Sequence, residues 1–93
     1  MTKVLNLSNL GLTELPELPE GLNELDCHNN YIKELPKLPK SLKRLYCYNN
    51  SIDELPELPE GLEWLYCLNN PFTPEEEARI EQECKDKDIK LYT

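Results

Sequence analysis

The chain repeats one pattern of residues at a constant spacing. The pattern reads Leu-Pro-x-Leu-Pro-x-x-Leu-x-x-Leu-x-Cys-x-x-Asn, and it begins at Leu15, again 20 residues later at Leu35, and once more at Leu55. A fixed period of this length is typical of solenoids, in which each coil contacts only its neighbours and the stacked coils bury one continuous core. The repeat therefore constrains the fold more than any local preference does. It also directs the search for function to residues that differ between coils.

Each repeat contains a short segment in which apolar and polar residues alternate. In the first full repeat, Leu25, Asp26 and Cys27 predict a strand whose Leu25 and Cys27 side chains face the core. Strands one repeat apart run in the same direction, so we expect them to stack into a parallel sheet. An asparagine follows each strand, and a buried amide there needs hydrogen bonds to the turn backbone. The predicted structural ladders are Asn30, Asn50 and Asn70, and the inward thiols Cys27, Cys47 and Cys67.

The Leu-Pro-x-Leu-Pro segment returns the chain from one strand to the next. Proline lacks an N–H and fixes φ, so this segment is expected to be extended and polyproline-like rather than helical. With about three residues per turn, the two leucines of each segment, such as Leu35 and Leu38, point to the same side. We therefore expect these leucines to complete the core from the convex side of each coil.

The N-terminal end departs from the repeat. Residues 4–14 align with residues 24–34, so the first coil is a half coil that begins at its strand. Leu10 stands where the ladder asparagine would be. We expect no separate cap before this strand, and an edge that is open to pairing with another chain.

The C-terminal end is predicted to close the solenoid. Thr73 suits the N-cap of a helix, Pro74 suits its first position, and Glu76 is placed to complete a capping box. Capping and the helix dipole alone explain the acidic run at residues 75–77, and the helix should end near residues 85–87. Residues 88–92 then alternate as a fifth strand, which we expect to align with residues 64–68.

The repeat resembles a leucine-rich repeat over Leu5 to Phe72, about three-quarters of the chain. Its 20-residue length and double Leu-Pro are similar to the bacterial subtype, which is typical of effectors that pathogens inject into host cells and of related bacterial and phage proteins. The resemblance implies an α/β solenoid: a leucine-rich repeat with a short parallel β-sheet on the concave face, a polyproline-like convex side, a C-terminal capping helix and a final strand. It also implies a scaffold whose concave sheet binds other proteins.

We expect residues 1–93 to form a single leucine-rich-repeat domain. The expected division is an N-terminal half repeat at 1–14, full repeats at 15–34, 35–54 and 55–74, and a helix–strand cap at 74–93. Such stacked coils bury a core even in a chain this short.

The composition narrows the classes of partner and compartment. A net charge of −8 disfavours nucleic acid and anionic membranes as partners, because Lys and Arg must neutralise phosphates. No apolar run is long enough to cross a membrane, and no secretory signal peptide is seen. Three of the four cysteines share one repeat position and are predicted to be reduced core residues rather than disulfide partners. We therefore expect a cytoplasmic protein, or one delivered into a host cytosol.

The predicted register places a set of polar and aromatic side chains on the concave face. This face holds the only Trp and four of the five Tyr, and an exposed aromatic cluster is typical of a binding hot spot. Tyr48, Leu68 and Tyr92 are expected to form one row, beside a row of Tyr46 and Tyr66. The predicted partner-binding residues are Glu24, Asp26, His28, Arg44, Tyr46, Tyr48, Trp64, Tyr66, Leu68 and Tyr92.

Three interpretations of this face remain open. The first is a protein partner with a basic surface, attracted by Glu24 and Asp26 beside the aromatic residues. The second is a homodimer, formed through the concave face or through the N-terminal edge. The third is that aromatic cross-strand pairs only stabilise the sheet.

Catalysis is not predicted. His28 shares its face with Asp26 and Glu24, but an exposed sheet provides neither a water-excluded pocket nor a set of metal ligands. We expect no enzyme activity, no metal and no cofactor. The predicted function is that of a non-catalytic protein–protein interaction module, as an effector or inhibitor. The alternative is a self-associating, minimal or designed repeat scaffold without a dedicated ligand.

Overall fold

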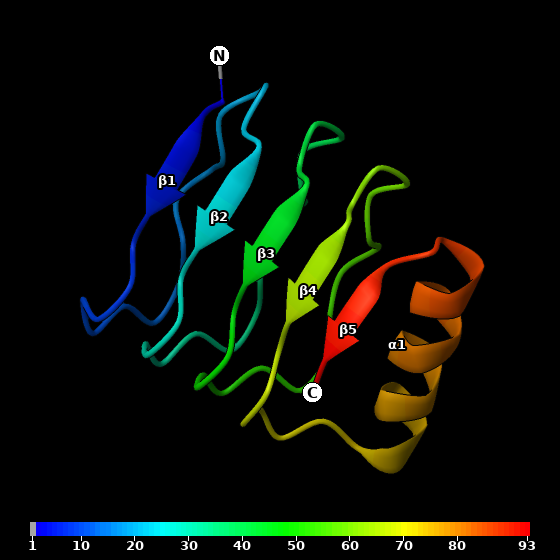
Figure 1. Ribbon diagram of the computed structural model, residues 1–93. Helices are drawn as coiled ribbons and strands as arrows, with labels where there is room; N and C mark the ends of the chain where they lie inside the picture. Colours follow the sequence, from blue (N-terminus) through cyan, green and yellow to red (C-terminus); the bar gives the residue numbers. More distant parts are fainter. Residues whose placement is uncertain (1) are drawn as a thin grey trace.

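The computed structural model describes residues 2–93 and consists of stacked coils joined by one parallel sheet (Figure 1). The sheet has five strands in the order β1-β2-β3-β4-β5, so strands that follow one another in the sequence are neighbours in space. In the sequence, one helix comes between the last two strands, and it lies beside the end of the sheet (Figure 1). The elements are β1 Val4–Asn6, β2 Glu24–Asp26, β3 Arg44–Tyr46, β4 Trp64–Tyr66, α1 Pro74–Asp86 and β5 Lys90–Tyr92. The predicted parallel solenoid is confirmed.

The register of the first four strands follows the repeat without a shift. Leu25 pairs with Leu45, and Leu45 pairs with Leu65. These leucines and the cysteines two positions after them are between 0% and 1% exposed. The intervening residues, such as Asp26 and Tyr46, point to the other side of the sheet. The predicted phase of the strands is therefore confirmed.

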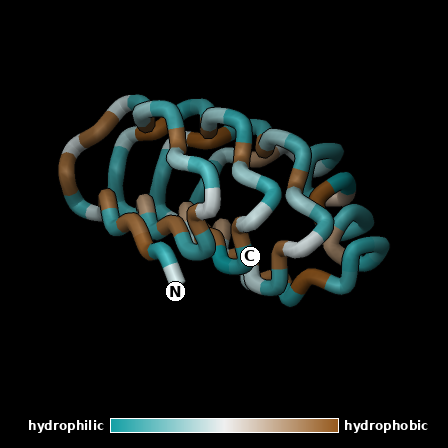
Figure 2. Tube along the Cα trace, turned by 90° about the horizontal axis from the view of Figure 1, so that it is seen from above, coloured by the Kyte–Doolittle hydropathy of each residue, from teal (hydrophilic) through white to brown (hydrophobic). Residues whose placement is uncertain are grey.

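The core lies between the sheet and the segments that return the chain to the next strand. Leu35, Leu38, Leu55 and Leu58 are at most 7% exposed, and the return segments carry neither helix nor strand hydrogen bonding. Figure 2 shows the coils lying side by side, with the strands along one side and the return segments along the other. The two leucines of each Leu-Pro-x-Leu-Pro segment thus complete the core, as their spacing predicts.

The asparagines after the strands form the predicted inner ladder. Asn50 accepts a hydrogen bond at Oδ1 from the backbone N–H of Ile32 (3.1 Å) and donates from Nδ2 to the carbonyls of Cys27 (3.0 Å) and Cys47 (3.1 Å). Asn30 and Asn70 make the equivalent bonds in their own coils. Each amide therefore connects the backbones of two adjacent coils.

The register of β5 differs from the prediction by two residues. Lys90 pairs with Trp64 and Tyr92 pairs with Tyr66, whereas the alternation had suggested Asp88 opposite Trp64 and Tyr92 opposite Leu68. The reason is the way in which α1 ends. Asp88 adopts a left-handed conformation with φ 54° and belongs to the turn, so it does not contribute to the sheet.

The N-terminus of α1 forms as predicted, but the capping box is only half made. Thr73 is the N-cap, Pro74 is the first helical residue, and the Thr73 hydroxyl accepts a hydrogen bond from the N–H of Glu76 (3.1 Å). The Glu76 carboxylate does not return to the N-cap. Glu76 is 9% exposed, and its carboxylate accepts a hydrogen bond from the backbone N–H of Leu55 (2.9 Å). Capping alone therefore does not explain the acidic run.

Polar side chains of α1 and of its C-cap residue, Lys87, bind the backbone of the last return segment. Glu83 accepts from the N–H of Leu58 (3.0 Å), and Lys87 donates to the Leu58 carbonyl (2.6 Å). Arg79 donates to the Leu55 carbonyl (3.0 Å) and to both Glu76 and Glu83. These contacts satisfy backbone groups of the last return segment on the side that α1 covers.

The N-terminal end of the sheet has no such cover within residues 2–93. β1 is an edge strand, and its Val4 side chain is 56% exposed. Leu10, at the place of the missing ladder asparagine, is 59% exposed. The open edge expected from the sequence is therefore present in the described part of the chain.

Candidate functional site

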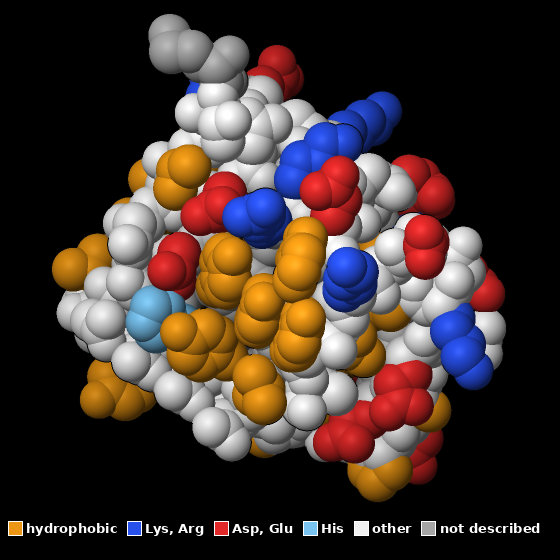
Figure 3. All heavy atoms as spheres, in the orientation of Figure 1, with side chains coloured by type: hydrophobic (Ala, Val, Ile, Leu, Met, Phe, Trp, Pro, Cys, Tyr) orange, Lys and Arg blue, Asp and Glu red, His pale blue; other side chains and the backbone are white. Residues whose placement is uncertain are grey.

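Outward-pointing side chains of the sheet form one continuous face, here called the sheet face. Because side chains alternate along each strand, every strand contributes its first and third residues to this face. The second residue after the end of β2, β3 and β4 (His28, Tyr48 and Leu68) lies at the edge of the face. Figure 3 shows hydrophobic side chains gathered over β3 to β5, with basic side chains beside them and acidic side chains towards β2. The structure places every predicted partner-binding residue on this face.

Three tyrosines stack across neighbouring strands. The ring centroids of Tyr46 and Tyr66 lie 4.8 Å apart with an interplanar angle of 21°, and those of Tyr66 and Tyr92 lie 4.4 Å apart at 5°. We call these residues the tyrosine row. Tyr92 extends the row of Tyr46 and Tyr66 rather than the row of Tyr48 and Leu68, which corrects the prediction and follows from the shifted register of β5. Partial burial, followed by the neighbouring Tyr92 and Tyr46, raises the pKa of Tyr66.

Trp64 lies between two cations. The Arg44 guanidinium is 5.7 Å from the Trp64 ring centroid, and the Lys90 ammonium is 4.8 Å from it. Arg44 precedes Trp64 in the sheet and Lys90 follows it, so the two cations flank the indole from neighbouring strands. Lys90 was not among the predicted partner-binding residues. The correct register of β5 would have identified it.

The acidic part of the sheet face lies on β2. Glu24 pairs with Arg44 at 3.8 Å, a separation too long for a hydrogen bond, so this exposed ion pair contributes little stability. Asp26 accepts a hydrogen bond at Oδ1 from the His28 backbone N–H (3.2 Å) and pairs through the same atom with the ring Nδ1 of His28. The His28 ring also stacks on Tyr48, with centroids 4.5 Å apart.

Sequence reasoning missed a second asparagine ladder, which lies outside the inner one. The side-chain amide of Asn69 donates to Asn49 (2.7 Å), Asn49 donates to Asn29 (2.7 Å), and Asn29 donates to Asn9 (2.9 Å). All four have positive φ between 55° and 58°, a conformation that asparagine tolerates better than most residues. The repeated Asn-Asn pair was the signal, since only the second asparagine was assigned a role.

The predicted cysteine column is buried and its thiols are free. Cys27, Cys47 and Cys67 are between 0% and 1% exposed. Burial and then the nearby Asp26 charge raise the pKa of Cys27 to about 12, and burial raises the pKa of Cys47 well above its ordinary value. Burial likewise raises the pKa of Cys84, which packs in the core near Ile80, to about 11. Thiols of this kind are poor nucleophiles.

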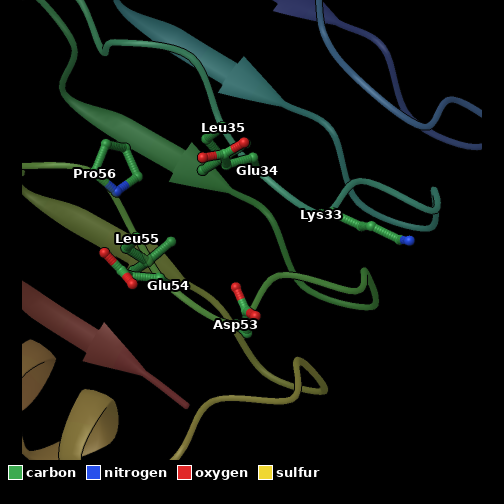
Figure 4. Close-up of a pocket in the computed structure, with 7 residues that line it drawn as sticks. All are labelled: Lys33, Glu34, Leu35, Asp53, Glu54, Leu55 and Pro56. Carbon is green, nitrogen blue, oxygen red and sulfur yellow. The ribbon is translucent and has the colours of Figure 1, made fainter.

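The part of the chain that the structure describes contains no cluster of three or more residues arranged to hold a metal ion. Among residues 2–93, no helix is long and apolar enough to cross a membrane. An open depression of about 270 Å³ lies between neighbouring return segments. In Figure 4 the Lys33 side chain extends away from the carboxylates of Glu34, Asp53 and Glu54. This depression is lined by Lys33, Glu34, Leu35, Asp53, Glu54, Leu55 and Pro56.

Comparisons with known proteins identify the repeat. A family model described as Leucine Rich Repeat matches residues 41–62. YopM from Yersinia enterocolitica is 48% identical with a TM-score of 0.73, over 74% of this chain and 15% of that chain. A leucine-rich-repeat protein of Leptospira interrogans is 27% identical with a TM-score of 0.79, over 98% of this chain and 25% of that chain. The leucine-rich-repeat domain of a Shigella effector is 29% identical with a TM-score of 0.63, over 74% and 41% respectively. No curated protein matches.

The chain spans between 15% and 41% of the length of these solved structures, so the similarity concerns their repeats rather than the whole proteins. The repeat motif and the parallel solenoid agree with the comparisons, and proteins built from such repeats are generally interaction modules. The chain is therefore a leucine-rich-repeat protein whose repeats resemble those of bacterial effectors.

Proposed function

We propose that this chain is a non-catalytic interaction module that binds a partner protein through the sheet face. The observation that carries the proposal is the tyrosine row with Trp64, an aromatic surface on an accessible side of the molecule. Aromatic side chains give large contact areas at low entropic cost, and they are enriched in the residues that dominate binding energy. The similarity to leucine-rich repeats of bacterial effectors supports a role in protein binding, as an effector or inhibitor.

Charge supports a partner with a basic surface. The chain has a net charge of −8, and the sheet face carries Glu24 and Asp26 next to the aromatic residues. Complementary charge speeds association and orients the partner, although it adds less to affinity than the buried aromatic contacts do. The proposed compartment is a reducing one, either the cytoplasm or a host cytosol, and the buried free thiols are consistent with this.

The experiment compares capture of a partner by the wild-type chain and by a variant carrying Tyr46→Ala with Tyr66→Ala. Tyr31→Ala is the matched control, because Tyr31 is 66% exposed but lies in a loop outside the sheet face. The partner recovered with wild-type protein is purified, and its affinity for each variant is measured by calorimetry. Thermal unfolding of each variant shows whether it is still folded.

We expect the double variant to bind the partner about 100-fold more weakly or worse, as hot-spot truncations do, and Tyr31→Ala to bind like the wild type. An unchanged affinity of the folded double variant would remove the sheet face from the proposal. A wild-type chain that sediments as a dimer, and a double variant that sediments as a monomer, would instead favour self-association.

A further inference from the structure

The tyrosine row has a free ring face at its β2 end. Tyr66 is covered on both faces, by Tyr46 on one side and by Tyr92 on the other. Tyr46 is stacked only on Tyr66, so within residues 2–93 no aromatic ring or cation covers the face of Tyr46 that is turned towards β2. The Trp64 indole differs, because Arg44 and Lys90 already flank it.

The next place in the row is occupied by a short side chain. Asp26 pairs with Tyr46 in the sheet, and Asn6 pairs with Asp26 on β1. Aspartate and asparagine are shorter than tyrosine and carry no ring, so the row of stacked rings stops at Tyr46. We call the place above Asp26, beside the free face of Tyr46, the slot. Neighbouring strands are about 4.8 Å apart, which is close to the spacing of the stacked rings.

Two carboxylates lie at this slot. Asp26 uses Oδ1 for both of its contacts with His28, and Oδ2 has no hydrogen-bond partner among the described residues. Glu24 is on the same face of the same strand, two residues before Asp26, and its contact with Arg44 is loose at 3.8 Å. At the other end of the row, Tyr92 lies on the edge strand β5, and among residues 2–93 no carboxylate residue pairs with it in the sheet.

We propose that Tyr46, Asp26 and Glu24 form a subsite for an arginine side chain of the partner protein. The guanidinium would lie flat against Tyr46 as one further member of the row and would donate hydrogen bonds to Asp26 Oδ2 and to Glu24. Arginine suits this slot because its guanidinium is planar, stacks on aromatic rings and can donate two parallel hydrogen bonds to a carboxylate. A lysine ammonium is a compact point charge and cannot stack in this way. The inference rests on the proposed function and specifies the group that is recognised.

The probe is a set of three acetylated, amidated tripeptides, Gly-Arg-Gly, Gly-Lys-Gly and Gly-citrulline-Gly, titrated into the full chain and followed by NMR. Citrulline keeps the planar shape of arginine without the charge, and lysine keeps the charge without the plane. We expect dissociation constants in the millimolar range, with the largest chemical-shift changes at the Tyr46 ring protons. The arginine peptide should bind about 3- to 30-fold more tightly than the citrulline peptide, which is the combined range of an exposed cation–π contact and a surface ion pair.

Variants locate the site. Asp26→Asn with Glu24→Gln should remove the ion-pair part of the preference for arginine over citrulline, and Tyr46→Leu should remove the cation–π part. Asp53→Asn with Glu54→Gln is the matched control, because it removes the same charge from the return side of the coils. If Asp26→Asn unfolds the chain, Glu24→Gln alone and Tyr46→Leu still test the subsite.

Equal binding of the arginine and citrulline peptides, or an equal loss of affinity in the control variant, would overturn the inference. Shifts centred away from Tyr46 would do so as well. These outcomes are distinguishable from failure of the proposed function. A captured partner that depends on Tyr46 and Tyr66 but is indifferent to Asp26 and Glu24 would retain the binding face and remove only the arginine subsite.

Discussion

The inner asparagine ladder should be one of the most sensitive parts of this fold, and Asn50→Ala tests it. Removal of the amide leaves the N–H of Ile32 without an acceptor, and Ile32 is 0% exposed. The Cys27 and Cys47 carbonyls each keep one partner, because Asn30 also donates to Cys27 (3.0 Å) and Asn70 also donates to Cys47 (3.0 Å). The variant therefore has one unsatisfied buried donor and loses two hydrogen bonds of 3.0–3.1 Å, besides a longer one to the Tyr48 carbonyl (3.4 Å).

These losses determine how far the free energy of unfolding of the variant should fall. An unsatisfied buried donor costs about 1–3 kcal/mol, and each lost hydrogen bond costs about 1 kcal/mol, so the free energy of unfolding should fall by about 3–5 kcal/mol. That is a large part of the 5–15 kcal/mol typical of a whole domain, as an order-of-magnitude guide. The melting temperature should therefore fall by more than about 10 °C for a chain of this size.

The measurement is urea unfolding at pH 7, followed by circular dichroism and by the fluorescence of Trp64, the only tryptophan. Asn49→Gly is the matched control, because Asn49 belongs to the outer ladder and its φ of 57° suits glycine. We expect the control to lose about 1 kcal/mol. If Asn50→Ala lost no more stability than this control, the inner ladder would not be the stabilising device described here.

Three further predictions concern the cap, the core and the sheet face. Hydrogen bonds from Arg79 lower the pKa of Glu76, so the Glu76 carboxylate stabilises the fold above the ordinary carboxyl pKa of 4.5, and this stabilisation is lost as the pH falls below 4.5. Urea unfolding at several pH values from 7 to 3 should show this loss. Glu76→Gln should lower the free energy of unfolding by about 1–3 kcal/mol at pH 7 and make it depend less on acid pH. A thiol reagent monitored by absorbance should modify Cys27 and the other cysteines only on unfolding, and rapid reaction of the native chain would contradict their burial. Lys90→Met should change the fluorescence spectrum of Trp64 while altering stability by less than about 1 kcal/mol, and an unchanged spectrum would argue against the cation–π contact.

The repeating part of the fold could be predicted from the sequence because the same pattern of leucine, proline, cysteine and asparagine recurs in each full coil. A single Leu-x-Cys segment would be a weak strand signal, but its return at Leu25, Leu45 and Leu65 fixes both the strand and its phase. Phase then decides which side chains lie on the sheet face, since alternate residues point to opposite sides. The positions of Tyr46, Trp64 and Tyr66 on that face follow from this step alone.

The final strand was predicted with the correct side chains facing out but in the wrong register. A shift of two residues leaves every side chain on the same face of a sheet, so the alternation at residues 88–92 fits both alignments equally well. The choice between them depends on where α1 ends, and the left-handed turn at Asp88 follows Lys87, whose N–H bonds to the Glu83 carbonyl. Such turn geometry is not encoded in the alternation. As a result, the contact of Lys90 with Trp64 and the place of Tyr92 in the tyrosine row were not predicted.

The hydrogen bonds between the side chains of α1 and the last return segment were not predicted for a different reason: they join residues that are distant in the sequence. On the sequence, Glu76 and Glu83 resemble the solvated acidic residues of any surface helix. In the structure their carboxylates accept hydrogen bonds from the N–H groups of Leu55 and Leu58. Arg79 and Lys87 donate hydrogen bonds to the carbonyls of the same two leucines. Burial alone would raise the pKa of Glu83, but the hydrogen bonds from Lys87 and from the Leu58 N–H outweigh it and lower the pKa below its ordinary value. An apolar helix would cover the leucines of the last coil yet leave these backbone groups unsatisfied, which explains why charged side chains close this end of the solenoid.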